Sequence, residues 1–97
     1  MRRFRTGHHD TNHADITAAL QGIGAVTYDT SMVGHGFPDA VAGWCGRTLL
    51  IEVLGEYTWA GERREHQARR VGWKGGEWLI VKDRDDLLRQ LGVGVVG

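Results

Sequence analysis

The sequence contains one cysteine, one proline and no long apolar run. The single thiol, Cys45, excludes a disulfide within the chain and suits a reducing compartment. No stretch approaches the roughly 18 apolar residues of a membrane-spanning helix, and no signal-peptide pattern opens the chain. These features predict an intracellular, cytoplasmic protein that does not cross a membrane.

An excess of charge of either sign is also missing. Lysine and arginine together number 12 and aspartate and glutamate also 12, so the formal net charge is +0. A globally basic field that attracts nucleic acid is therefore excluded, and any such contact must come from local clusters. Lysine is limited to Lys74 and Lys82, but two arginine clusters are present, although solvated surface positions explain either one equally well. They comprise Arg2, Arg3 and Arg5 at the N-terminus, and Arg63, Arg64, Arg69 and Arg70 farther along.

Hydrophobic periodicity predicts one small α/β (α+β) domain over residues 1–97. We expect a central mixed four-stranded sheet flanked by helices, in the order α-β-β-β-α-β-α. The expected helices span 10–22, 62–73 and 83–91, and the expected strands span 25–28, 40–44, 48–54 and 77–81. Residues 1–9 are expected to form a mobile basic arm and residues 92–97 a frayed tail.

The first helix is expected to start at Asp10 or Thr11, either of which can cap it. Its buried stripe follows the i, i+3, i+4, i+7 rule and comprises Ile16, Ala19, Leu20 and Ile23. Asn12 and His13 lie before this stripe near the inward face, where a polar group either satisfies backbone groups or reaches into a site. Asp15 falls off the stripe and is expected in solvent.

The segment 36–54 is predicted to form a β-hairpin that turns around Gly46 and carries two carboxylates. Asp39 precedes the first strand and Glu52 lies near the end of the second, so both fall toward the same end of the ladder. A charge inside so apolar a strand is costly to bury unless a partner pairs with it. A divalent cation is the simplest partner, because magnesium prefers hard oxygen ligands. Pro38 stiffens the backbone before Asp39, although a strand-initiating proline before a polar turn residue explains the pair without a site.

The second strand of the hairpin is apolar on both faces, which predicts a central strand that is covered on both sides. One face comprises Thr48, Leu50, Glu52 and Leu54, and the other Leu49, Ile51 and Val53. The helix 62–73 places Arg64, Gln67, Ala68 and Val71 along one side, and Gln67 is expected to point toward the sheet. The loop 55–61 carries Glu56, Tyr57 and Trp59, which are typical of a binding or interface loop.

An ordered set of motifs resembles the small phage-type virus-type replication-repair nuclease (VRR-NUC) domains of the PD-(D/E)xK nuclease superfamily. The matching residues are Asp10-Thr11-Asn12, Gly36-Phe37-Pro38-Asp39, Glu52-Val53, Gln67, Trp78-Leu79-Ile80-Val81 and Asp85-Asp86-Leu87-Leu88. The resemblance covers about residues 8 to 91. Two departures stand out: Leu54 replaces the motif lysine, and the segment 60–64 lacks the Leu-Thr that commonly opens the family's second helix.

This resemblance implies a restriction-endonuclease-like fold and a Mg²⁺- or Mn²⁺-dependent DNA endonuclease in a bacterial or phage-infected cell. Asp39, Glu52 and the carbonyl of Val53 would bind the metal ion. Asn12 or His13 would hold a metal-bound water from the first helix, and Gln67 would orient the nucleophilic water or a phosphate oxygen.

The expected substrate is branched DNA, such as a Holliday junction or a flap. The arginines of the helix 62–73, together with Arg3 and Arg5, are the candidates for phosphate binding. A homodimer is expected because symmetric incision of a four-way junction needs two sites related by a two-fold axis. Exposed Tyr57, Trp59 and Trp73 favour the same conclusion.

Three alternatives stay open. The lysine of the motif stabilises developing negative charge and leucine cannot, so Leu54 favours a catalytically impaired member that binds DNA or a protein partner. His8, His9 and His13 form a weak transition-metal pattern, because His9 and His13 have i, i+4 spacing, although surface histidines explain it better. An inert oligomeric structural protein is the third, and it leaves the buried Glu52 unexplained.

Overall fold

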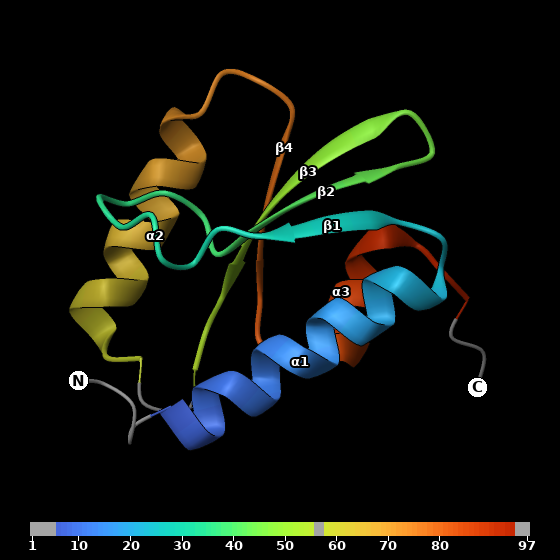
Figure 1. The fold of residues 1–97 in the computed structure, drawn as a ribbon. Coiled ribbons are helices and arrows are strands. Elements are labelled where there is room, and N and C mark those ends of the chain that lie inside the picture. The colour runs from blue at the N-terminus through green and yellow to red at the C-terminus, as the bar shows by residue number, and fades with distance from the viewer. Residues whose placement is uncertain (1–5, 56–57, 95–97) are drawn as a thin grey trace.

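The computed structural model of the chain describes residues 6–55 and 58–94, with side chains from residue 12 onward. Within these residues the order is α1 (Thr6–Gly22), β1 (Val26–Asp29), β2 (Ala40–Trp44), β3 (Arg47–Val53), α2 (Ala60–Gly72), β4 (Glu77–Val81) and α3 (Arg84–Leu91). Helices α1 and α3 lie together on one face of the sheet and α2 lies on the other (Figure 1). The predicted α-β-β-β-α-β-α order is confirmed.

The four strands form one mixed sheet in the order β1-β2-β3-β4. The β1–β2 and β2–β3 pairs are antiparallel, and the β3–β4 pair is parallel because α2 crosses over between them. The hairpin turns through Cys45 and Gly46, both of which have positive φ angles, as a two-residue type I′ turn requires. The sheet that the sequence predicts is therefore present, with β3 at its centre.

The hydrophobic core lies between the sheet and the pair α1 and α3. Ile16 and Leu20 of α1 are fully buried there, while Ala19 and Ile23 are partly buried, which confirms the predicted stripe. The sheet and α3 contribute Leu49, Ile51, Val53, Val81, Leu87 and Leu91. Asp15 is exposed, as expected.

The second face of the sheet is covered only in part, so the prediction that β3 is covered on both sides is wrong. Partners in register share a face, and the register places Tyr28, Val41, Leu50 and Trp78 in one row across the four strands. Of these, Tyr28 is exposed and the other three are half-buried. Helix α2 covers the end of this face at Glu52 and leaves the rest open.

Two boundary predictions also need correction. Helix α1 begins at Thr6, so the expected mobile arm does not hold for residues 6–9, and residues 1–5 lie outside the described residues. Helix α3 ends at Gly92 in the left-handed conformation, and Val93 donates its N–H to the Leu88 carbonyl and packs against the core. The tail is therefore ordered through Val93.

No helix in the described part of the chain is long and apolar enough to cross a membrane.

Candidate active site

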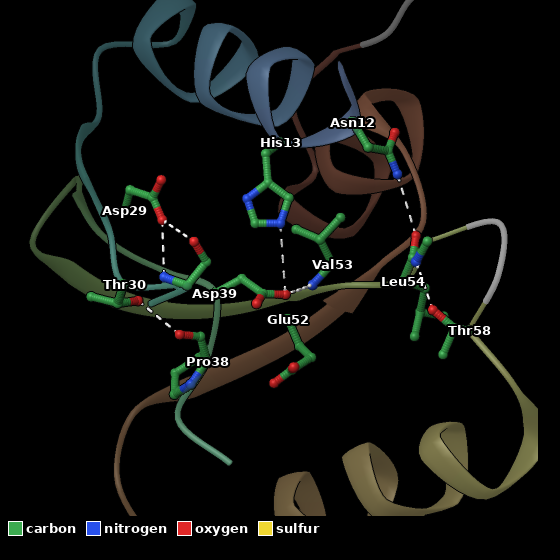
Figure 2. A network of polar contacts seen from close by, with 12 residues as sticks. Asn12, His13, Asp29, Thr30, Pro38, Asp39, Glu52, Val53, Leu54 and Thr58 are labelled. Atoms are coloured by element: carbon green, nitrogen blue, oxygen red, sulfur yellow. Dashed lines mark hydrogen bonds and ion pairs between the residues drawn. The ribbon is translucent and has the colours of Figure 1, made fainter. Parts of the chain in front are cut away.

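Asp39 is held at the end of the β2–β3 ladder by backbone contacts on both sides. Thr30 donates its hydroxyl to the Pro38 carbonyl at 2.7 Å and its N–H to the Asp39 carbonyl at 2.9 Å. The Asp39 N–H donates to the Ile51 carbonyl at 2.9 Å, and Oδ2 of Asp39 accepts from the Val53 N–H at 2.8 Å (Figure 2). The carboxylate thus takes the place of a strand carbonyl, and the hairpin backbone fixes its position.

Glu52 lies beside Asp39 on the neighbouring strand. Ala40 pairs with Ile51, so Asp39, one residue before, faces Glu52, one residue after. Both positions therefore fall at the same end of the hairpin, as its pattern predicts. Figure 2 shows the Glu52 side chain pointing toward α2, whereas that of Asp39 turns toward Val53 and His13. The two carboxylates are neighbours that contact different partners.

Glu52 carries the most perturbed carboxyl group of the site. Its side chain is only 6% exposed. Burial and the nearby charge of Asp39 raise its pKa from 4.5 to about 7, while Arg69 acts in the opposite direction. Oε1 of Glu52 is buried, and no described residue donates a hydrogen bond to it. A carboxylate in this state would be stabilised by a cation.

His66 of α2 is the residue of this site that the sequence analysis missed. Its ring is buried, and Nδ1 lies 3.3 Å from Oε2 of Glu52 and 2.8 Å from Nη2 of Arg69. Burial and the charge of Arg69 lower the pKa of His66, which favours the neutral ring. Because a guanidinium only donates, Nδ1 then accepts from Arg69 and leaves Glu52 without a donor from the ring.

Gln67 does not point toward the sheet, and that prediction is wrong. It is exposed, and it borders a shallow hollow on the outer side of α2 together with Arg63, Arg64 and Val71. The inward stripe comprises Glu62, His66 and Arg69, at i, i+4 and i+7. The predicted side, with Gln67, Ala68 and Val71, is barely apolar and is exposed, whereas His66 and Arg69 face inward, where Glu52 lies.

Arg69 supplies the positive charge closest to Glu52 that the structure describes. Its guanidinium contacts His66, and its side chain lies against Gly36, where an added Cβ would stand 3.0 Å from Cδ of Arg69. Leu54, at the motif-lysine position, is half-buried on the same side of β3 as Glu52. Lys74 and Lys82 are both exposed. Arg69, which was predicted only as one of the phosphate-binding arginines of this helix, therefore lies beside Glu52.

The two candidates on α1 differ in what they contact. Asn12 donates from Nδ2 to the Leu54 carbonyl at 3.3 Å and to the Lys82 carbonyl at 3.1 Å. It therefore satisfies the backbone at the ends of β3 and β4, the first of its two expected roles. His13 does reach the site, because its Nε2 lies 4.0 Å from Oδ2 of Asp39 (Figure 2).

The other candidate arginines lie outside this cluster. Arg63, Arg64 and Arg70 are exposed on α2. Arg63 donates to the Thr58 carbonyl at 3.2 Å and Arg70 to the Trp78 carbonyl at 3.1 Å, so both are anchored to the loop and strand that flank the helix. Arg3 and Arg5 lie outside the described residues.

The donor set suits a cation of the magnesium class. Among the described residues, no three His, Cys, Asp or Glu side chains gather as a ready-made metal cage. Magnesium, however, usually keeps several waters and binds through one or two carboxylates. Asp39 and Oε1 of Glu52, to which no described residue donates, offer these oxygens, and the Val53 backbone lies directly beside Asp39. The side chains of His8 and His9 are not among those described.

Comparison of the chain with protein-family models, with curated proteins and with solved structures finds no match. The resemblance to VRR-NUC domains therefore stays a prediction that rests on the motif residues.

Proposed function

We propose that the protein is a metal-dependent DNA endonuclease of the PD-(D/E)xK class. One observation carries the proposal: Glu52 is buried opposite Asp39, its pKa is raised to about 7, and its Oε1 has no donor among the described residues. If no cation bound at this position, an apolar residue in place of Glu52 would make the fold more stable. The mixed sheet, in which a β-hairpin carries the two carboxylates and a parallel strand follows, also supports this class.

Each residue of the cluster has a distinct role in the proposal. Asp39 and Glu52 would hold Mg²⁺ or Mn²⁺, which supplies an activated water and neutralises charge on the scissile phosphate when it is bound. Arg69 is positioned to bind a phosphate oxygen next to Glu52, and His66 orients its guanidinium. His13 is positioned to hold a water near Asp39.

The proposed substrate is branched DNA, which a homodimer would cut symmetrically. Phosphate contacts come from α2, because Arg63, Arg64 and Arg70 are exposed there. Contacts to phosphate do not depend on the base sequence, so binding is selective for the structure of the DNA and tolerant of its sequence.

A DNA- or protein-binding module that does not cut is the second candidate, and Leu54 is the observation that favours it. Leucine offers neither charge nor hydrogen-bond donor at the position of the motif lysine. The fold and the α2 arginines would serve this function unchanged.

Metal binding tests the site directly. Isothermal calorimetry with MnCl₂ should show one site, and Mn²⁺ should raise the melting temperature by linkage. Asp39→Asn should abolish both effects, whereas Asp29→Asn, on β1, should keep them. Absence of heat and of a thermal shift in the wild type would contradict the site itself.

Cleavage then separates the two candidates. A labelled four-way junction and a splayed duplex are incubated with Mn²⁺ under single-turnover conditions, with the wild type and Asp39→Asn in parallel. Cleavage by the wild type alone supports the nuclease. Metal binding without any cleavage of either substrate supports the binding module.

A further inference from the structure

The open face of the sheet carries an apolar pocket of about 400 Å³ next to the candidate active site. Leu50 and Trp78, which are partners across β3 and β4, form its floor. Phe37 and Pro38, from the loop between β1 and β2, and Trp73, which directly follows α2, also line it. The volume lies in the range of pockets that hold small organic groups.

This pocket lies on the same face of β3 as Glu52 and next to Asp39 along the chain. Leu50 and Glu52 are two residues apart in β3, so their side chains project from the same face, about 6–7 Å apart. Pro38 directly precedes Asp39. A nucleotide that presents its phosphate to Glu52 therefore has this apolar pocket beside it on the same face of the sheet.

The surroundings of the pocket favour a ligand that is both aromatic and attached to phosphate. Trp73 is 44% exposed and meets Trp78 edge to face at 5.6 Å between ring centroids. Arg69 lies against Gly36 at one border, and Arg70 binds the Trp78 carbonyl at another. The residues that line the pocket include no acidic side chain, and Nε1 of Trp78 is a buried donor that no described residue accepts from.

We propose that this pocket binds one unpaired nucleobase of the DNA substrate, stacked on Trp73, while the adjoining phosphate faces Asp39, Glu52 and Arg69. The inference rests on the proposed function and narrows its substrate to DNA with an unpaired nucleotide at the cleavage site. A base inside a duplex cannot enter, because pairing and stacking hold it in the helix. A second copy of the chain is the competing occupant, but the exposed apolar side chains outside the pocket, such as Tyr28, suit it better than the concave part.

Binding without metal ion tests the pocket independently of cleavage. Affinities for a splayed duplex, a fully paired duplex with the same number of phosphates, and a splayed duplex with abasic arms are measured in EDTA. Base stacking on an aromatic side chain contributes roughly 1–3 kcal/mol, so Trp73→Ala should weaken binding to the splayed duplex by about five- to 150-fold. Its affinity for the paired duplex should stay unchanged, and the wild type should lose the same factor on abasic arms.

Two variants control for indirect effects. Trp59→Ala removes an even more exposed tryptophan, at 65%, which does not line the pocket, and it should leave the ratios of the three affinities unchanged. Trp73→Phe keeps an aromatic face and should retain most of the preference for the splayed duplex. Light scattering on each variant reports the oligomeric state.

Three results would overturn the proposal: equal losses of affinity of Trp73→Ala for paired and splayed duplexes, unchanged wild-type affinity for abasic arms, or a dimer that Trp73→Ala converts to a monomer. If the wild type nevertheless cuts DNA with Mn²⁺, only the pocket is refuted and the proposed function stands. If no cleavage occurs but the preference for unpaired bases is found, the proposed pocket stands and the protein is the binding module, not the nuclease.

Discussion

At the scale of single residues, the state of Glu52 decides how the protein responds to pH. The carboxyl titrates near 7 in the folded chain and near 4.5 when it is unperturbed. Between these values the unfolded chain has released its proton while the folded chain retains it. The free energy of unfolding of the metal-free protein should therefore fall as the pH rises through this window, by at most about 3 kcal/mol.

Glu52→Gln should remove this contribution, because the amide stays neutral at every pH. His66 acts in the opposite direction: because its pKa is lowered, its contribution to the free energy of unfolding increases as the pH rises toward about 6.5 and is constant above that value. His66 is present in both proteins. Urea denaturation of both proteins from pH 4.5 to 7.5 measures the difference. Parallel profiles would contradict the raised pKa of Glu52.

A second prediction at this scale concerns the missing lysine. Loss of one preorganised charge-stabilising donor costs on the order of 10²–10³ in rate in other enzymes. If Leu54 leaves the site short of charge, Leu54→Lys should raise metal-dependent cleavage by at least about tenfold, roughly 1.4 kcal/mol of barrier. Single-turnover rates with Mn²⁺ measure this change, with Leu54→Lys plus Asp39→Asn as the inactive control.

The alternative is that Arg69 supplies the positive charge that the motif lysine would provide. If the wild type already cuts rapidly, then Arg69→Gln should lower the rate by about 10²–10³, since its guanidinium is the positive charge beside Glu52. Arg84→Gln on α3 should leave the rate unchanged. Equally rapid cleavage by the wild type and by Arg69→Gln would show that neither position 54 nor Arg69 determines the cleavage rate.

At the scale of elements, α2 is predicted to provide the phosphate contacts. Replacing Arg63, Arg64 and Arg70 by glutamine should weaken DNA binding uniformly across sequences. It should also flatten the salt dependence, since each phosphate that is no longer neutralised lowers the slope of log K against log salt by about 0.9. The control replaces the two arginines of α3, Arg84 and Arg89, because this helix lies on the opposite face of the sheet (Figure 1). Fluorescence anisotropy at several salt concentrations gives the affinity and its salt dependence. Equal slopes in the two variants would exclude α2 as the source of the phosphate contacts.

The same elements show what the sequence could and could not predict. β2 and β4 begin and end where their apolar runs and turn residues indicate, and the α1 stripe follows from its helical period. The inward side of α2 could not be predicted, because burial of His66 and Arg69 depends on Glu52, a residue from another element. The open face of β3 was also missed, since an apolar strand face indicates burial whether or not a helix is long enough to cover it.

For the site, local pattern was enough to place Asp39 and Glu52 together, because a hairpin register follows from its turn. The partners of these carboxylates come from α1 and α2, more than ten residues away in sequence on either side. Their choice depends on how the helices are seated on the sheet. No periodicity within one helix contains that information.

At the scale of the whole molecule, we predict a homodimer. The Cα radius of gyration is 13.1 Å, which is typical of a compact chain of this length, so the core is small. Exposed apolar side chains gather in β1 and the turn after it: Val26, Tyr28, Met32 and Val33. Such a patch on a small protein marks an interface.

Light scattering at micromolar concentration should give twice the monomer mass. Tyr28→Lys with Met32→Lys should shift the mass to that of the monomer, because two buried charges would be left unpaired. Trp73→Ala should remain dimeric. A monomeric wild type would count against both the dimer and the symmetric cutting of a junction.

The hydrogen bond from Val53 to the Asp39 carboxylate has a consequence for how the site can be observed. The final rung of the β2–β3 ladder depends on a side chain, whereas its neighbouring rungs depend on the main chain. Exchange of the Val53 amide hydrogen with solvent therefore reports the position of a single carboxylate. One backbone signal in an NMR spectrum reads the occupancy of the site in solution, without DNA and without a catalytic turnover.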